Sequence, residues 1–163
     1  MKPAARVQAA IEIMDTILGN GYRAEHALKS WGRENRFAGS KDREAIRDYV
    51  YDALRNLRTF AARGGSLTGR AILISALREH GVEPDTIFTG ERFAPLPLTQ
   101  DESIIRNGLS PADSFNLPDW LWRIWKEDLD NKAEVVALAL ARRAPIFLRV
   151  NFQKISRQQV IDK

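Results

Sequence analysis

The chain has 163 residues, of which 44% are hydrophobic and 28% charged, and it carries a net charge of +4. This composition predicts a globular protein of one domain, or of one domain and part of a second, and excludes a disordered chain. Because there is no cysteine, disulfides, thiolate zinc sites, iron–sulfur clusters and cysteine nucleophiles are excluded. Two histidines are too few for a histidine-based metal cage, so we expect no metal partner.

Neither a targeting segment nor a membrane segment is evident. The apolar residues between Val7 and Leu18 are interrupted by Glu12 and Asp15, which the apolar core of a signal peptide would not tolerate. No stretch approaches the ~20 apolar residues that cross a membrane as a helix. We therefore expect a cytoplasmic protein with no membrane partner.

The positive charge is concentrated in the first part of the chain. Residues 1–70 hold thirteen Lys and Arg against eight Asp and Glu, whereas residues 71–163 hold twelve against thirteen. A basic half of this kind is typical of a nucleic-acid surface. The alternative is a set of solvated helix faces with a mild basic bias.

Four amphipathic helices are predicted in the first 80 residues, from apolar residues that recur every three or four positions. Their expected ranges are 3–18, 22–35, 41–62 and 68–80. Glycines stand at or near their ends and favour turns there. Because such helices are not stable singly in water, we expect them to share one core.

The segment 81–116 contains four of the seven prolines and should form a long connection over the bundle, with room for only short helical pieces, such as one at 101–106. Helical periodicity returns from Pro118. The spacing predicts that Trp120 and Trp125 lie on the buried face of this helix and that Trp122 points away as a contact residue. A further helix is expected over 132–142.

The last residues change character again. The apolar run Ile146 to Val150 predicts a strand, and Ile155 to Val160 is typical of the first turn of a helix. A single strand has no partner for its backbone groups, and so short a helix does not persist alone. We therefore interpret residues 117–163 as a helical linker and the incomplete start of an α/β domain.

No catalytic centre is predicted. Gly64 to Arg70 has the spacing of a phosphate-binding loop, but it follows a helix instead of a strand. The acidic pair Asp101 and Glu102, like Glu127 and Asp128, falls in exposed turns, where a solvated surface is the simpler interpretation. We expect no catalytic, cofactor-binding or metal-binding residue in this chain.

The arginines of the predicted helix 41–62 allow two interpretations. Arg43, Arg47, Arg55 and Arg58 fall within one side of that helix. They could follow the phosphates of an RNA, or they could form weak ion pairs, since Glu44–Arg47 and Asp52–Arg55 are three residues apart.

The stretch from Leu117-Pro118-Asp119-Trp120-Leu121 to Arg143-Ala144-Pro145-Ile146-Phe147-Leu148-Arg149-Val150-Asn151-Phe152-Gln153-Lys154 resembles the N-terminal part of the RsmB/NOP/Sun (Fmu) family of RNA cytosine-5 methyltransferases. The shared pattern is P-x-W-L followed by R-x-P-x-x-L-R-V-N-x-x-K. The preceding bundle, with Arg6-Val7-Gln8-Ala9-Ala10 and Ser40-Lys41-Asp42-Arg43, is similar to a NusB-like RNA-binding domain.

The resemblance implies an all-α fold, with a NusB-like helical bundle over residues 1–116 and a linker with the first strand of a truncated α/β domain over 117–163. It implies that the chain recognises RNA, ribosomal RNA being the expected substrate, for an S-adenosylmethionine-dependent methyltransferase. That family binds its cofactor through a P-G-G-K-type loop and attacks cytosine with the cysteine of a D-x-P-C motif. Neither motif occurs here, so chemistry and cofactor are expected in a C-terminal methyltransferase domain outside this chain.

The predicted RNA contacts come from two sources. Five arginines of the basic half are expected to hold phosphates, and three residues of the family motif are expected to make RNA-side or interdomain contacts. They are Arg6, Arg43, Arg47, Arg55 and Arg58, and then Arg149, Asn151 and Lys154. Two other functions stay open: a free-standing NusB-like factor that binds RNA with protein partners, and a helical protein-interaction module with no role in RNA binding.

Overall fold

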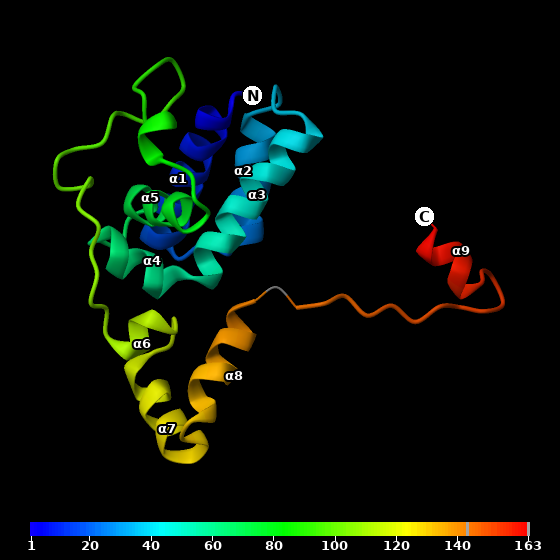
Figure 1. Cartoon of the computed structure of the whole chain (residues 1–163). Coiled ribbons are helices and arrows are strands. Elements are labelled where there is room, and N and C mark those ends of the chain that lie inside the picture. The colour runs from blue at the N-terminus through cyan, green and yellow to red at the C-terminus, as the bar shows by residue number, and fades with distance from the viewer. Residues whose placement is uncertain (143, 163) are drawn as a thin grey trace.

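The computed structural model describes residues 1–142 and 144–162, and its regular structure over these residues is helical, with no strand (Figure 1). The N-terminal helices are α1 (Pro3–Asn20), α2 (Ala24–Glu34), α3 (Ser40–Arg55), α4 (Leu57–Gly64) and α5 (Gly69–Glu79). They are followed by the 3-10 helix η1 (Pro84–Thr86), α6 (Pro111–Ser114), α7 (Asp119–Leu129), α8 (Lys132–Ala141) and α9 (Arg157–Ile161). The all-α class is confirmed, while the likeness of the bundle to NusB stays a prediction. Within the described part of the chain, no helix is long and apolar enough to cross a membrane.

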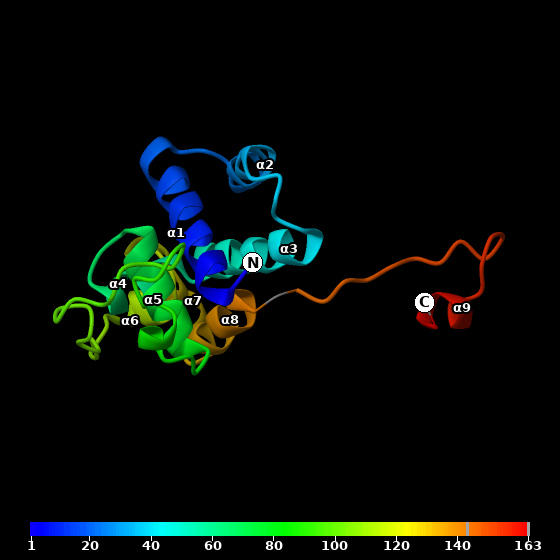
Figure 2. The same ribbon diagram turned by 90° about the horizontal axis from the view of Figure 1, so that it is seen from above.

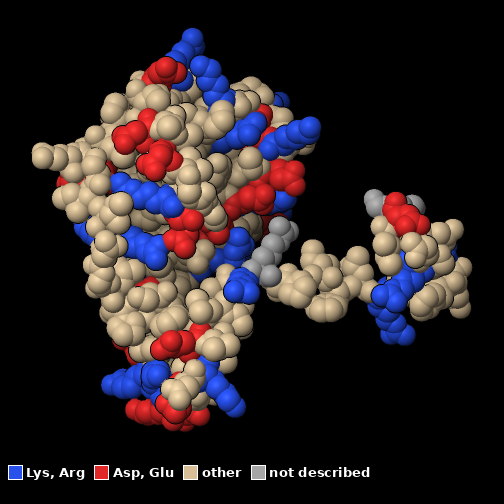
Figure 3. All heavy atoms as spheres, viewed as in Figure 1, with Lys and Arg blue, Asp and Glu red and all other residues tan. Residues whose placement is uncertain are grey.

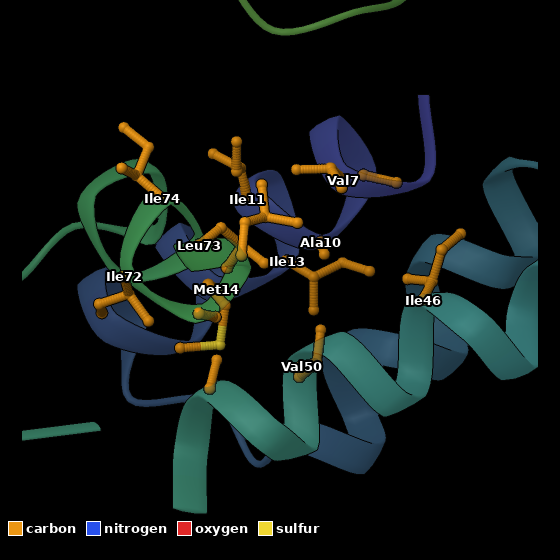
Figure 4. Close-up of a cluster of buried hydrophobic side chains, with 14 of the residues drawn as sticks. Val7, Ala10, Ile11, Ile13, Met14, Ile46, Val50, Ile72, Leu73 and Ile74 are labelled. Atoms are coloured by element: carbon orange, nitrogen blue, oxygen red, sulfur yellow. The ribbon is translucent and has the colours of Figure 1, made fainter. Parts of the chain in front are cut away.

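Helix α1 lies at the centre of the bundle and packs against α2, α3 and α5. Its apolar residues are buried around most of its circumference, including Val7, Ala10 and Met14, each with no exposed surface. Figure 4 shows these side chains meeting those of α3 and α5, among them Ile46 and Leu73. The apolar periodicity of the sequence therefore places one shared core among α1, α2, α3 and α5.

The predicted helix 41–62 is two helices, because the chain turns at Asn56. This residue leaves the helical conformation, at φ −115° and ψ 25°. Its Nδ2 donates to the Asp52 carbonyl at 3.1 Å, beside the bond from its own backbone N–H to the same oxygen. An asparagine side chain that competes for a helical carbonyl favours a helix end over continuation. The prediction of one long helix was wrong for this reason.

The segment 87–106 lies over the bundle, as expected. Phe88 is 2% exposed and belongs to the core, and Glu102 accepts hydrogen bonds from Arg70 at 2.6 and 2.9 Å. Arg78 also donates to the Glu102 carbonyl, at 2.7 Å. The helical piece predicted at 101–106 is instead a turn. Glu102 is thus the main tie between this connection and α5.

A polar cluster, the α4 lock, joins the start of α4 to the segment that leads into α7. It consists of Arg58, Thr59, Asp113, Asn116 and Asp119. The Arg58 guanidinium donates to Asp113 at 2.6 Å and to Asp119 at 3.1 Å, and Thr59 Oγ1 donates to the Asp113 carbonyl at 2.6 Å. Asn116 Oδ1 accepts the Arg58 backbone N–H at 2.8 Å, which supplies a partner for one of the free N–H groups at the helix start.

Helices α7 and α8 form a hairpin below the bundle (Figure 1). Two of the three tryptophan assignments were wrong: Trp120 is 57% exposed, while Trp122 is half-buried and stacks on Phe115, with ring centroids 4.9 Å apart. Trp125, which was also assigned to the buried face, is half-buried. Trp122 faces inward because α7 packs against α6. The periodicity of α7 alone could not predict this contact.

From Ala144 the chain runs outward from the hairpin and ends in the single turn of α9 (Figures 1 and 2). The predicted strand over 146–150 is not formed, and among the described residues no second strand is present for it to pair with. Four large apolar side chains of this tail are at least 75% exposed: Ile146, Phe147, Leu148 and Phe152. Arg143 of the family motif lies outside the described residues, as does Lys163.

Replacing Arg58 with alanine should loosen the α4 lock. The two carboxylates would lose their cation, so we expect the free energy of unfolding to fall by about 1–3 kcal/mol. Amide hydrogen exchange should also accelerate in α6 and α7 while α1 stays protected. Arg55→Ala, which changes an exposed arginine three residues earlier, is the matched control and should change stability by less than about 0.5 kcal/mol. Unchanged exchange in α7 would contradict this role of Arg58.

Acid should weaken the tie made by Glu102. Hydrogen bonds from Arg70 lower the pKa of this carboxyl to about 2, from an ordinary 4.5. Because the pKa is lower in the folded state, the stabilisation is complete above about pH 4.5 and is lost as the pH falls towards 2. Glu102→Gln should therefore cost up to about 3 kcal/mol at pH 7 and much less at pH 2. Urea unfolding of both proteins at the two pH values measures this, and an equal cost at both would refute it.

Candidate nucleic-acid interface

The outer face of α3 carries four exposed residues at intervals of four, which we call the α3 ridge: Arg43, Arg47, Tyr51 and Arg55. This spacing places successive side chains on neighbouring positions of one helix face. The opposite face buries Ile46, Val50 and Ala53 in the core, which fixes the direction of the ridge. At 1.5 Å per residue, the ridge is about 18 Å long.

A hollow lies on each side of the α3 ridge. One, of about 670 Å³, lies between α2 and α3, where Lys29 joins Arg43, Arg47 and Tyr51 in its lining. The other, of about 700 Å³, is lined by Arg47, Tyr51, Arg55 and His80. The ridge thus separates two concave surfaces that share Arg47 and Tyr51. Each lining mixes cations with two carboxylates, Glu25 and Glu44 in the first and Asp48 and Asp52 in the second.

Arg43 is the cation of the ridge whose side chain is held by contacts with the backbone. Its Nε donates to the Ala38 carbonyl at 2.9 Å, and its guanidinium lies against Gly32 of α2, where a methyl group would collide with it. The backbone therefore orients Arg43, and among the described residues no carboxylate lies within 4 Å of its guanidinium, which suits a phosphate contact.

Arg47 and Arg55 make weak ion pairs. Arg47 lies 3.6 Å from Glu44 and 3.8 Å from Asp48, and Arg55 lies 3.7 Å from Asp52. All of these side chains are exposed except that of Asp52, which is partly buried. The two pairs expected at a spacing of three residues are both present. Exposed pairs at such distances contribute little, ~0–1 kcal/mol, and can yield to a phosphate. Acidic and basic side chains alternate over the face of the bundle in Figure 3, so no patch of a single sign is visible there.

Arg6 and Arg58 do not lie on the ridge. Each binds a carboxylate of another segment, and we call these two arginines the framework arginines. Arg6 lies on α1 and binds Asp42 at 2.8 Å, beside the Met1 amino group at 3.1 Å. Hydrogen bonds from that amino group and from Arg6 lower the pKa of Asp42. Arg58 belongs to α4, so the predicted run of four arginines on one helix ends at Arg55. The hydrogen bond to Asp113, together with that to Asp119, raises the pKa of Arg58.

Arg149, Asn151 and Lys154 are exposed residues of the tail and are not brought to the ridge, because this segment runs away from the bundle (Figure 1). Asn151 organises a turn there: its Oδ1 accepts the Gln153 N–H at 3.1 Å, and its carbonyl accepts the Lys154 N–H at 2.9 Å. The roles predicted for these three residues remain predictions.

Sequence reasoning missed three residues of this surface: Lys29, Tyr51 and His80. Tyr51 could have been found, since it continues the four-residue spacing of Arg43 and Arg47. His80 gave no sequence signal, because it reaches the surface from the end of α5, where its Nε2 lies 2.8 Å from Asp52.

The described residues hold no group of three or more His, Cys, Asp or Glu side chains that could bind a metal ion. They do not fit S-adenosylmethionine either, because residues 1–142 and 144–162 contain no strand that could precede a cofactor-binding glycine-rich loop. What the described residues do present is a pair of concave surfaces beside the α3 ridge.

Arginines of the framework and of the ridge should respond differently to substitution. Arg6→Ala leaves the partly buried Asp42 with one cation fewer and should lower the free energy of unfolding by about 1–2 kcal/mol. Arg47→Ala should change it by less than about 0.5 kcal/mol. Thermal unfolding of the two variants tests this, and equal losses would show that Arg47 is also part of the framework.

Residues 117–163 match the protein-family model described as Methyltr_RsmF/B-like, ferredoxin-like domain. The matched range includes α7, α8, the extended tail and α9, and the bundle lies outside it. No curated protein and no solved structure matches the chain. The match supports the resemblance to the RsmB/NOP/Sun family seen in Pro118 to Lys154: the C-terminal part of this chain is similar to a domain of RsmF/RsmB-like methyltransferases.

Proposed function

We propose that this chain is the RNA-recognition part of an S-adenosylmethionine-dependent RNA cytosine-5 methyltransferase, with ribosomal RNA as its substrate. The observation that carries the proposal is the match of residues 117–163 to a domain of RsmF/RsmB-like methyltransferases, directly after a helical bundle with an arginine ridge. The bundle binds the RNA, and the methyl transfer is performed by a domain C-terminal to these residues.

The α3 ridge supplies the phosphate contacts in this proposal. Its three arginines present forked donors that suit phosphate oxygens, and Tyr51 between them adds an aromatic surface. Contacts of this kind position an RNA but read little sequence, so the affinity should depend strongly on salt. Arg149, Asn151 and Lys154 act at the junction with the catalytic part, on the RNA or on the neighbouring domain.

The tail supports a connection to a further domain. Its large apolar side chains are exposed, and its backbone is extended without a strand partner among the described residues. Both features are costly in water and are relieved when a strand joins a sheet. In the proposal, Ile146 to Val150 forms such a strand within the ferredoxin-like domain.

Affinity for a structured ribosomal RNA fragment should fall steeply with salt. Arg43→Glu/Arg47→Glu should weaken binding at least tenfold and reduce the slope of log affinity against log salt, because two phosphate contacts are lost. Lys132→Glu/Arg142→Glu makes the same change of charge on the α7–α8 hairpin and is the control. Fluorescence anisotropy from 50 to 300 mM salt measures both.

Absence of RNA binding, or an affinity that does not change with salt, would refute the proposed function. Equal losses in the two double variants would indicate an unspecific effect of net charge and refute the role of the ridge. A helical protein-interaction module predicts that neither variant changes any RNA property.

A further inference from the structure

A further hollow of the described surface lies apart from the α3 ridge, between the start of α1, the end of α2 and the loop 91–96. It measures about 1000 Å³, and we call it the aromatic pocket. Small residues of α1, Ala5 and Ala9, contribute to its lining, together with Trp31, Phe37 and Phe93. Three aromatic side chains from separate segments therefore surround one cavity.

Two of these rings are largely in water. Phe37 is 73% exposed and Phe93 is 67% exposed, so neither ring contributes much to the folded core. Exposed aromatic side chains gathered around one cavity are typical of a binding surface.

The backbone at Phe93 is strained. Its φ is +68°, in the left-handed region that a bulky residue rarely adopts. Two backbone bonds hold the loop, Gly90 N–H to the Pro95 carbonyl at 2.9 Å and Ala94 N–H to the Glu91 carbonyl at 2.8 Å. The loop maintains this strain while the Phe93 ring stays 67% exposed, which favours the hypothesis that the ring is positioned for a ligand instead of for the core.

The charges beside the rings favour a nucleic acid. The Arg92 guanidinium lies 4.8 Å from the centroid of the Phe93 ring, and Lys2, which makes only a long, exposed ion pair with Glu91 at 3.8 Å, lines the same pocket. Glu12 is a carboxylate of the same lining, and the neutral Gln8 amide that donates to its Oε1 at 2.8 Å does not offset its charge, so the pocket holds cations and one anion. Aromatic faces next to cations are the arrangement on which unpaired bases stack while their phosphates meet positive charge.

The pocket also adjoins the candidate interface. Trp31 lines both the aromatic pocket and the hollow between α2 and α3 that contains Arg43 and Arg47. We propose that the aromatic pocket stacks an unpaired base of a single-stranded RNA segment whose neighbouring paired region lies on the α3 ridge. This inference rests on the proposed function and adds a site for unpaired nucleotides. An apolar peptide would use the rings but not the adjoining cations, so RNA is the occupant that the charges favour.

Two RNAs test the pocket, a fully paired hairpin and the same hairpin with an unpaired extension that contains 2-aminopurine. Phe37→Ala and Phe93→Asn remove one ring each, and asparagine tolerates the left-handed backbone at residue 93. Each variant should bind the extended RNA about tenfold more weakly and quench 2-aminopurine less, while its affinity for the paired hairpin stays unchanged. Leu67→Ala, at a 60% exposed apolar residue outside the pocket lining, is the control and should change neither.

The thermal midpoint of Phe93→Asn should equal or exceed that of the parent, because the exposed ring gives the fold little. Unchanged affinity and quenching for the extended RNA in both variants, with binding to the paired hairpin intact, would overturn the pocket and leave the proposed function standing. If neither RNA binds the parent protein, the proposed function fails and this inference fails with it.

Discussion

The bundle depends on how closely α5 approaches α1 at Gly69. The Gly69 N–H donates to the Asp15 carboxylate at 2.6 Å, and a side chain at this position would collide with the Ile11 carbonyl oxygen. With no such side chain, α5 begins directly against α1, and the seven residues from Ala71 to Leu77 are all buried. Glycine is therefore required here by contact distance, although its own φ is not in the left-handed region. The resulting pair of helices forms the centre on which the other elements pack.

This centre determines which side of α3 is free. Because α1 and α5 already supply much of the apolar surface, α3 buries one narrow face and leaves the Arg43-to-Arg55 face to solvent. Arginines at the junctions between elements are bound in ion pairs instead of being left to solvent. Arg6 and Arg58 each meet a partly buried carboxylate, Asp42 and Asp113, at 2.8 and 2.6 Å. The role of an arginine in this protein therefore follows from whether a carboxylate of another element reaches it.

The apolar periodicity of the sequence predicted most helices, but it did not predict which side chains of other elements they contact. The periodicity located α1, α2, α5, α7 and α8 to within a few residues, because each helix needs an apolar stripe. It missed the turn at Asn56, which depends on one side chain. It assigned the opposite exposures to Trp120 and Trp122, since Phe115, directly after α6, decides which ring is covered. It also grouped Arg58 with the ridge, because Asp113, its partner, lies 55 residues further along the chain.

The mixed charges of the surface restrict how this protein could recognise RNA. A net charge of +4 is small for 163 residues, and two of the three arginines of the ridge, Arg47 and Arg55, have acidic neighbours within 4 Å. Fields from such a surface are screened within ~8–10 Å at physiological salt, so long-range steering contributes little. In the proposed function, recognition therefore depends on short-range contacts, in which guanidinium groups meet phosphates and rings stack on bases. The proposal assigns the first kind of contact to the α3 ridge and the second to the aromatic pocket, and Trp31 lines both the pocket and the hollow beside the ridge.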